Sequence, residues 1–311
     1  TPRKEDDCVE ILSGVFEGKT TGTPISMVVF NKTQRSQDYD HIKNIYRPGH
    51  ADFCFDAKYG FRDYRGGGRS SGRETIGRVA AGAVAIKILK QLGIEVTAYS
   101  KAIGGVEIDY DRFDKDEIAN NPLYMPDKEA SDKAQEYLKQ MMSEKNSVGG
   151  IIECVVDGMP AGIGEPVFDK LDANLAKAVM SIGAVKGVEI GDGFDVAGST
   201  GLSDNDGFEY KKDTDSYVKT SNHAGGILGG ISDGSQIVLR AAIKPTPSIA
   251  STQNTATSDK ENVEIEIHGR HDPIIVPRAV VVVESMVALT IVDLIFTSMT
   301  SRMDNIVRFF E

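Results

Sequence analysis

The chain contains no tryptophan and only three cysteines, Cys8, Cys54 and Cys154, among its 311 residues. Because the cysteines are odd in number and widely spaced, and no C-x-x-C pair occurs, we predict neither a disulfide framework nor a zinc site. Histidine is scarce as well, with five residues whose spacing relative to nearby acids does not match a metal site. We therefore expect ordinary thiols, no bound metal and a reducing, cytoplasmic compartment.

Positive charge is also in short supply: 35 Lys and Arg stand against 46 Asp and Glu, a net charge of −11. So acidic a chain disfavours general binding to nucleic acid, since phosphate binding needs a basic surface. The longest apolar stretch, residues 279–296, contains Glu284 and Asp293, which is typical of a globular helix rather than a membrane span. The composition predicts a globular protein with no nucleic-acid or membrane partner.

Several common catalytic fingerprints are missing from the sequence. No G-x-G-x-x-G follows a predicted strand, no P-loop occurs, and no G-x-S-x-G elbow is found. These absences argue against the usual dinucleotide, nucleoside-triphosphate and serine-hydrolase sites.

The hydrophobic pattern predicts a mixed α+β fold with antiparallel sheets, because strands come in groups and helices come singly between them. The predicted helices cover 74–92, 127–146, 169–182 and a long C-terminal segment from Pro277. The predicted strands cover 8–17, 23–30, 94–99, 103–108, 150–157, 185–190, 235–243 and 262–268. We expect Ser71 and Glu74 to form a capping box and Asp169 to cap the third helix. No linker is evident, so we predict one domain over residues 1–311.

Basic residues gather in one glycine-rich segment. Residues 57–73 carry a single acid, Asp63, against Lys58, Arg62, Arg65, Arg69 and Arg73. Guanidinium groups match phosphate and carboxylate oxygens, and the glycines at 66–68 allow close approach of backbone N–H groups. The segment therefore predicts a site for a polyanionic small molecule. An ion-paired surface loop, a subunit contact and an RGG-type nucleic-acid contact are the alternatives.

Three further segments could complete such a site. His50 lies close to Arg47 and Asp52, which could tune its pKa towards general-acid work. Lys244, with Thr246 and Ser248, could clamp a second phosphate, and the segment SNHAGG at 221–226 offers amide and backbone donors. Ordinary turn chemistry explains the last two segments equally well. The residues alone thus indicate a multiply anionic ligand with one or two phosphates.

Five segments in order along the chain resemble chorismate synthase. They are RPGHAD at 47–52, YGFRDYRGGGRSSGRET at 59–75, SNHAGGILGG at 221–230, KPTPSI at 244–249 and GRHDPIIVPRA at 269–279. The resemblance implies a 1,4-anti elimination of phosphate from 5-enolpyruvylshikimate-3-phosphate to give chorismate. It also implies a requirement for reduced FMN, delivered by an external flavin reductant in a pathway associated with NADPH. The implied fold is a layer of long helices between two antiparallel sheets, assembled as a homotetramer.

The resemblance also assigns roles to individual residues. It implies that His50 protonates the reduced flavin and that Asp272 lies beside the flavin N5 as the C6 hydrogen leaves. It implies that the substrate oxygens are held by Arg47, Arg73 and Arg270. It implies that the cofactor is bound by Ser70, Ser71, Arg73, Asn222, Lys244 and Ser248, with Lys244 and Ser248 on its phosphate. The arginine cluster suits this ligand set, because the substrate and FMN together carry two phosphates and two carboxylates.

The sequence departs from the family at its start. It begins Thr-Pro-Arg, and roughly 45 residues that usually precede this point, including a second catalytic histidine, do not appear in it. We expect the 311-residue chain alone to be catalytically impaired, since general-acid help is typically worth about 10²–10⁴-fold. The alternative is a protein that binds FMN or an anionic metabolite without turnover. An RNA-binding module is a third hypothesis.

Overall fold

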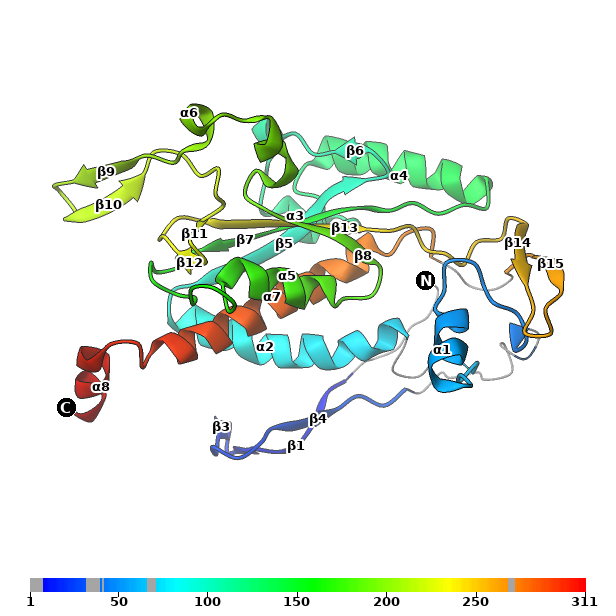
Figure 1. Ribbon diagram of the computed structural model, residues 1–311, viewed down its shortest axis with the longest axis horizontal. Helices are drawn as coiled ribbons and strands as arrows, with labels where there is room; N and C mark the ends of the chain where they lie inside the picture. Colours follow the sequence, from blue (N-terminus) through cyan, green and yellow to red (C-terminus); the bar gives the residue numbers. More distant parts are fainter. Residues whose placement is uncertain (1–7, 32–39, 41, 66–70, 268–271) are drawn as a thin grey trace. The chain divides into compact units, whose positions relative to one another are not determined.

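The computed structural model describes residues 8–31, 40, 42–65, 71–267 and 272–311 (Figure 1). The chain forms two compact units, each assembled from three segments. The first unit comprises residues 1–80, 136–148 and 245–275. The second comprises residues 81–135, 149–244 and 276–311.

The second unit is built on one five-stranded antiparallel sheet in the order β6-β5-β7-β13-β8. The strands are β5 (Glu95–Ile103), β6 (Val106–Glu107), β7 (Gly150–Asp157), β8 (Val185–Ile190) and β13 (Ile237–Ile243). Cys154 of β7 pairs with Ala98 of β5 and with Leu239 of β13. All three side chains are buried, as expected where alternate residues of neighbouring strands share one covered face.

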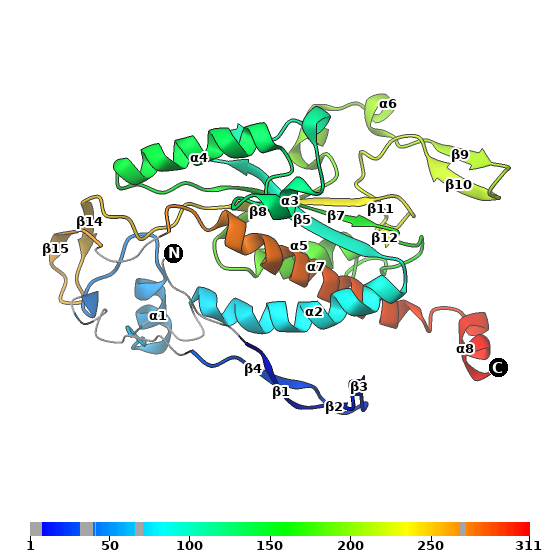
Figure 2. The same ribbon diagram turned by 180° about the vertical axis from the view of Figure 1, so that it is seen from behind.

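Three helices lie along that covered face in both views (Figures 1 and 2): α2 (Thr75–Gln91), α5 (Leu171–Met180) and α7 (Val276–Ser298). Helix α7 contacts β5, β7 and α5. It is the one described helix long and apolar enough to cross a membrane, but half of its apolar window is buried within the fold. It therefore has the character of a core helix. The start of α4 (Lys128–Ser143) lies over the opposite face of the sheet.

The beginning of α4 is fixed by Asp127, which is almost fully buried. Its carboxylate accepts hydrogen bonds from the N–H groups of Glu129 and Ala130 and from the guanidinium of Arg112. Burial alone would raise the pKa of Asp127, but the bonds from Arg112 and from the Asp109 and Ala130 N–H groups lower it to about 2. A charged acceptor at this position satisfies helix N–H groups that have no partner within the helix.

The first unit has small antiparallel pairs instead of a large sheet. β1 (Glu10–Ser13) pairs with β4 (Ser26–Val28), β2 (Val15–Phe16) with β3 (Lys19–Thr20), and β14 (Gln253–Ala256) with β15 (Asn262–Ile265). Helix α1 (Asp52–Tyr59) and the 3₁₀ helix η3 (Gly72–Glu74) complete it. Its small apolar cluster consists of Ile42, Ile45, Ile265 and Ile267.

The remaining elements all belong to the second unit. The helices are η4 (Tyr110–Arg112), α3 (Glu117–Asn120), η5 (Gly193–Gly198), α6 (Gly201–Asp204) and α8 (Met303–Phe310). The strands form two hairpins, β9 (Phe208–Lys211) with β10 (Ser216–Lys219), and β11 (Ile227–Leu228) with β12 (Ile231–Ser232).

The predicted α+β class with antiparallel pairing is confirmed, and the strands predicted at 150–157 and 185–190 have those bounds. Ser71 is confirmed as an N-cap, but the predicted capping box with Glu74 and the predicted cap at Asp169 are wrong. Helix α5 begins at Leu171 after Lys170 and has no side-chain cap, so Asp169 does not cap it. Ser71 caps the short helix η3 by accepting the Arg73 N–H, and Glu74 pairs with Arg78 of the next turn at 3.0 Å instead of closing a capping box.

Helices α2 and α7 approach closely at Gly82. A β-carbon at Gly82 would lie 2.7 Å from the Cα of Ser285, closer than real side chains come. A β-carbon at Gly77, on the same helix, meets no described heavy atom within 4 Å. Only one of these two helix glycines is therefore required for packing.

We predict that Gly82→Ala lowers the free energy of unfolding by about 1–3 kcal/mol, because overpacking outweighs the better helix propensity of alanine. Gly77→Ala should instead raise stability by up to about 1 kcal/mol. Urea denaturation of both variants measures this. Equal effects at the two positions would contradict the close approach.

The buried Glu284 on α7 leads to a second prediction, which concerns the pH dependence of stability. Burial raises the pKa of Glu284 above its ordinary value of 4.5, and the hydrogen bond from the Ala98 N–H only partly opposes this. The folded protein therefore holds this proton at pH values where the unfolded chain has released it. The stability contributed by the protonated carboxyl is complete below pH 4.5 and is lost as pH rises through the folded-state pKa.

Glu284→Gln should accordingly flatten the fall in stability on the alkaline side of pH 4.5. Thermal unfolding of both proteins between pH 4 and pH 8 measures this. Glu264→Gln, at an exposed site in the other unit, serves as the control and should leave the profile of the parent protein unchanged.

Candidate functional site

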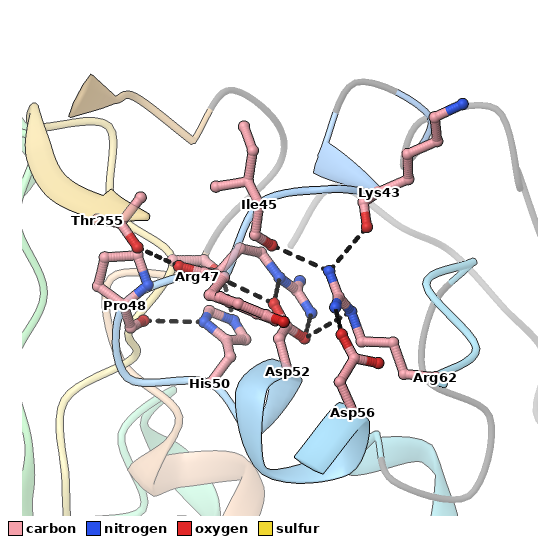
Figure 3. A network of polar contacts seen from close by, with 11 residues as sticks. Lys43, Ile45, Arg47, Pro48, His50, Asp52, Asp56, Arg62 and Thr255 are labelled. Atoms are coloured by element: carbon pink, nitrogen blue, oxygen red, sulfur yellow. Dashed lines mark hydrogen bonds and ion pairs between the residues drawn. The ribbon is translucent and has the colours of Figure 1, made fainter. Parts of the chain in front are cut away.

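His50 lies in a tight turn that leads into α1. Its N–H donates to the carbonyl of Arg47 at 3.2 Å, and Gly49 adopts the positive φ of 69° that this turn requires. The ring Nδ1 lies 3.0 Å from the carbonyl oxygen of Pro48 (Figure 3). On the other side of the ring, Nε2 lies 3.0 Å from Oγ of Ser248. Both ring nitrogens are thus engaged by residues of the first unit.

The same turn is held by Asp52, the first residue of α1. Arg47 donates its Nε and Nη2 hydrogens to the two oxygens of Asp52, each at 2.8 Å, and its backbone N–H at 3.1 Å (Figure 3). Burial alone would raise the pKa of Asp52, but these bonds and the charge of Arg62 lower it. Arg47, predicted to hold substrate oxygens, therefore has a fixed side chain with two of its nitrogens committed to Asp52.

Arg62 of the predicted anion-binding cluster has a structural position. Its side chain is only 8% exposed, and its guanidinium lies between Asp52 and Asp56. It also donates to the carbonyls of Lys43 and Ile45, at 2.8 and 3.0 Å (Figure 3). Arg62 is therefore an internal brace, as the alternative of an ion-paired loop proposed, and not a ligand for an external anion.

The chain before His50 is also held from the side opposite to α1. The Tyr46 N–H donates to the carbonyl of Ala256 at 3.0 Å, and the Thr255 hydroxyl donates to the carbonyl of Tyr46 (Figure 3). Ile45 forms an isolated bridge with Thr257. The turn that carries His50 is therefore tied both to α1 and to the β14–β15 hairpin.

A short segment after α4 joins two loops that are far apart in the sequence. The Ser147 hydroxyl donates to the carbonyl of Thr246 at 2.6 Å, and the Val148 N–H donates to the carbonyl of Pro273 at 2.9 Å. These adjacent residues bring residues 245–248 and the half-buried Asp272 to one place in the first unit. The sequence analysis missed this role, because residues 147 and 148 resemble an ordinary helix-to-strand connection.

Thr246 has an unsatisfied group at this place. Its hydroxyl is buried and has no hydrogen-bond partner among the described residues. A buried hydroxyl without a partner costs about 1–3 kcal/mol, so a water molecule or a bound polar group is expected to complete it. The hydroxyl of Thr246 therefore suits the phosphate or a polar edge of a flavin nucleotide.

The start of α2 provides the third part of the site in the first unit. Ser71 accepts the Arg73 N–H at 3.3 Å, while the half-buried Arg73 guanidinium has no partner within the described ranges. A cation of this kind beside helix N–H groups suits an anion. The predicted ligands Ser70 and Arg270 lie outside the described residues.

Asn222 and Lys244 belong to the second unit. The Asn222 side chain closes its own loop, since Oδ1 accepts the Gly226 N–H and Nδ2 donates to the Gln236 carbonyl, both at 2.8 Å. The Lys244 N–H donates to the carbonyl of Ala184 at 2.9 Å. The Asn222 side chain is thus committed to the loop, which leaves the backbone as the part of this loop best suited to meet a ligand.

The loop at 221–226 rests on a buried carboxylate that the sequence analysis did not identify. Asp206 accepts hydrogen bonds from the Ser221 hydroxyl and from the N–H groups of His223 and Ala224, at 2.7–3.0 Å. It also accepts from Lys219, at 2.8 Å. Burial would raise the pKa of Asp206, but these four donors lower it strongly. The loop is therefore rigid and pre-shaped.

His223 was also missed, because its partner is distant in the sequence. Its Nδ1 lies 2.7 Å from a carboxylate oxygen of Asp192, which raises the pKa of His223. The two residues lie next to each other because the Asp192 N–H donates to the His223 carbonyl at 2.9 Å. No spacing signal links residues 31 positions apart in two loops.

Comparison with known proteins supports one family across the chain. Residues 1–296 match the family described as Chorismate synthase. A protein of that name from Lachnospira eligens is 66% identical, over 100% of this chain and 84% of its own length. Another from Agathobacter rectalis is 64% identical with the same coverage. A solved structure, "Crystal Structure of Chorismate Synthase", superposes with a TM-score of 0.75 at 30% identity, over 97% of this chain and 82% of that one.

The ion pairs of Asp52 with Arg47 and Arg62 lead to a prediction. Asp52→Asn leaves the Arg47 and Arg62 guanidinium groups without a shared counter-ion, so we expect a loss of about 3 kcal/mol in the free energy of unfolding. In the parent protein this contribution is present above pH 3.8 and is lost as pH falls through the lowered folded-state pKa. Denaturation at pH 7 and pH 3 tests both statements.

The exposed variant Asp63→Asn is the matched control, because among the described residues Asp63 accepts only the N–H of Arg65. A loss of similar size in both variants would contradict a special role for Asp52.

Proposed function

The chain belongs to the chorismate synthase family, and we propose the parts that its residues play in the reaction of that family. The reaction removes phosphate from 5-enolpyruvylshikimate-3-phosphate by 1,4-anti elimination and gives chorismate. The family uses reduced FMN, which when bound lends electron density to the allylic centre as phosphate departs. The observation that supports the proposal is a set of three contacts within one unit: His50 with Ser248, Ser147 with Thr246, and Val148 with Pro273, the neighbour of Asp272.

His50 is the proposed acid. Its Nδ1 faces the Pro48 carbonyl, so Nε2 is the nitrogen that takes up or gives up a proton. The turn is braced by Arg47 and Asp52, which keeps the ring in place while its charge changes. General acids held in this way typically contribute about 10²–10⁴-fold to rate.

Cationic groups are proposed to hold the anionic ligands. Arg47, Arg73 and Arg270 bind substrate oxygens, and the departing phosphate is stabilised as charge builds on it. Arg47 can do so with its remaining Nη1, since Nε and Nη2 are held by Asp52. Asp272 is proposed beside the flavin N5, where a carboxylate assists the loss of the C6 hydrogen.

Reduced FMN is proposed to contact residues from several loops. These are Ser70, Ser71, Arg73, Asn222, Lys244 and Ser248. Lys244 provides the positive charge for the cofactor phosphate, and the unsatisfied hydroxyl of Thr246 supplies a further donor close by in the chain. Ser248 is proposed to lie on the same phosphate.

The wider setting follows the same family. We propose a homotetramer of single-domain chains in the cytoplasm, served by an external flavin reductant. The layered arrangement of helices between two antiparallel sheets is part of this proposal. The described residues supply one such sheet, together with several two-stranded pairs.

We expect anaerobic phosphate release from 5-enolpyruvylshikimate-3-phosphate with dithionite-reduced FMN and none with oxidised FMN. His50→Ala should lower the rate by about 10²–10⁴-fold. Lys133→Ala, an exposed change on α4, should leave the rate unchanged. Tight FMN binding without phosphate release would instead support a protein that binds the cofactor without turnover.

A further inference from the structure

We propose that Lys219 is a positioning residue for the loop at 221–226, since its buried ammonium holds the two aspartates that bind the two ends of this loop. The inference rests on the proposed function, in which the loop contacts the flavin nucleotide. All the groups involved belong to the second unit.

Lys219, the last residue of β10, lies between two acids. Its Nζ is 2.8 Å from a carboxylate oxygen of Asp206 and 2.8 Å from one of Asp233. The side chains of Lys219, Asp206 and Asp233 are only 2%, 1% and 6% exposed. Buried charges are costly unless opposite charges and hydrogen bonds replace their hydration. The three side chains therefore depend on one another.

Asp206 holds the start of the loop and needs its full negative charge to do so. One of its oxygens accepts from the Ser221 hydroxyl and the His223 N–H, and the other accepts from the Ala224 N–H and from Lys219. An ionised carboxylate has about four acceptor positions, so all of them are filled. A protonated Asp206 could not keep all four donors.

Asp233 holds the other end of the loop with its backbone. Its N–H donates to the carbonyl of Gly226 at 3.1 Å. Its carboxylate is fixed on two sides, by Lys219 and by the N–H of Ser235 at 2.9 Å. The course of the chain at Gly226 therefore depends on where Lys219 holds Asp233.

The charges of this cluster explain what loss of Lys219 would do. Asp206 and Asp233 both lie 2.8 Å from the same nitrogen, so without it two buried carboxylates would face each other. Like charges at such a place disfavour the ionisation of one of them. The loop would then lose a donor at its start or its support at Gly226. Arginine can supply the missing charge, whereas methionine, of similar length, cannot.

The first test is amide hydrogen exchange, followed by NMR in the protein without cofactor. Lys219→Met should speed exchange of the His223 and Ala224 N–H groups by about tenfold relative to the N–H groups of β7, and Lys219→Arg should keep most of their protection. Lys211→Met, an exposed change on the same hairpin, is the matched control and should change neither. Unchanged exchange at the two loop positions in Lys219→Met, or an equal increase throughout β7, would overturn the proposal.

The second test concerns the balance of charge. The double variant Lys219→Met with Asp233→Asn removes one cation and one anion together, so its urea midpoint should lie above that of Lys219→Met alone. In the parent protein Asp233→Asn should lower the midpoint. If Asp233→Asn lowers the midpoint equally in both backgrounds, the shared ion pair is contradicted.

Cofactor affinity provides the third readout. Lys219→Met should raise the Kd for FMN by about tenfold, whereas Lys219→Arg should stay within about threefold of the parent and Lys211→Met should not differ from it. An FMN affinity that is the same in Lys219→Met and in the parent would overturn the proposal. If the parent protein releases no phosphate, the proposed function fails, but hydrogen exchange still decides whether Lys219 holds the loop. The two failures are therefore distinguishable.

Discussion

Asp52 accepts both donor hydrogens of the Arg47 fork and also lies close to the buried guanidinium of Arg62, so one carboxylate neutralises two cations. The chain between Lys43 and His50 takes its course from this contact, because Arg62 also binds two of its carbonyls. A catalytic imidazole on a loop needs such support, since a displacement of about 1 Å can cost 100-fold in rate. The proposed acid of the site thus depends on the ion pairs of Asp52, and one of their partners, Arg47, is also proposed to hold the substrate.

Arginines of the segment at 57–73 have two different environments. Arg62 satisfies internal carboxylates and carbonyls, whereas Arg73 keeps a guanidinium with no partner in the described part of the chain. Burying a cation is costly unless carboxylates and carbonyls replace its water, and Arg62 has both. Within this segment Arg62 is thus neutralised internally, and Arg73 is a described arginine left for the proposed anion.

The sequence predicted most of the local structure and the kind of ligand, but fewer of the contacts. Strands 150–157 and 185–190 were predictable because their apolar runs end at clear breaks. The start of α5 was not predictable, because a local motif cannot show that Lys170, and not Asp169, directly precedes the helix. His50 could be proposed from its neighbours, but its contact with Ser248 spans 198 residues and depends on the fold.

Asp206 and the pair of Asp192 and His223 were not predicted either, because their contacts also depend on the fold. Asp206 binds backbone N–H groups, and Asp192 binds the His223 ring in another loop. In a sequence, acids of this kind cannot be told from solvated surface charges. Only burial shows that Asp206 must be paired, and once it is paired its four donors fix the shape of the 221–226 loop. In both units a buried carboxylate therefore fixes the shape of a loop: Asp52 holds the turn that carries His50, and Asp206 holds the loop at 221–226. Other groups of each loop do not bind that carboxylate.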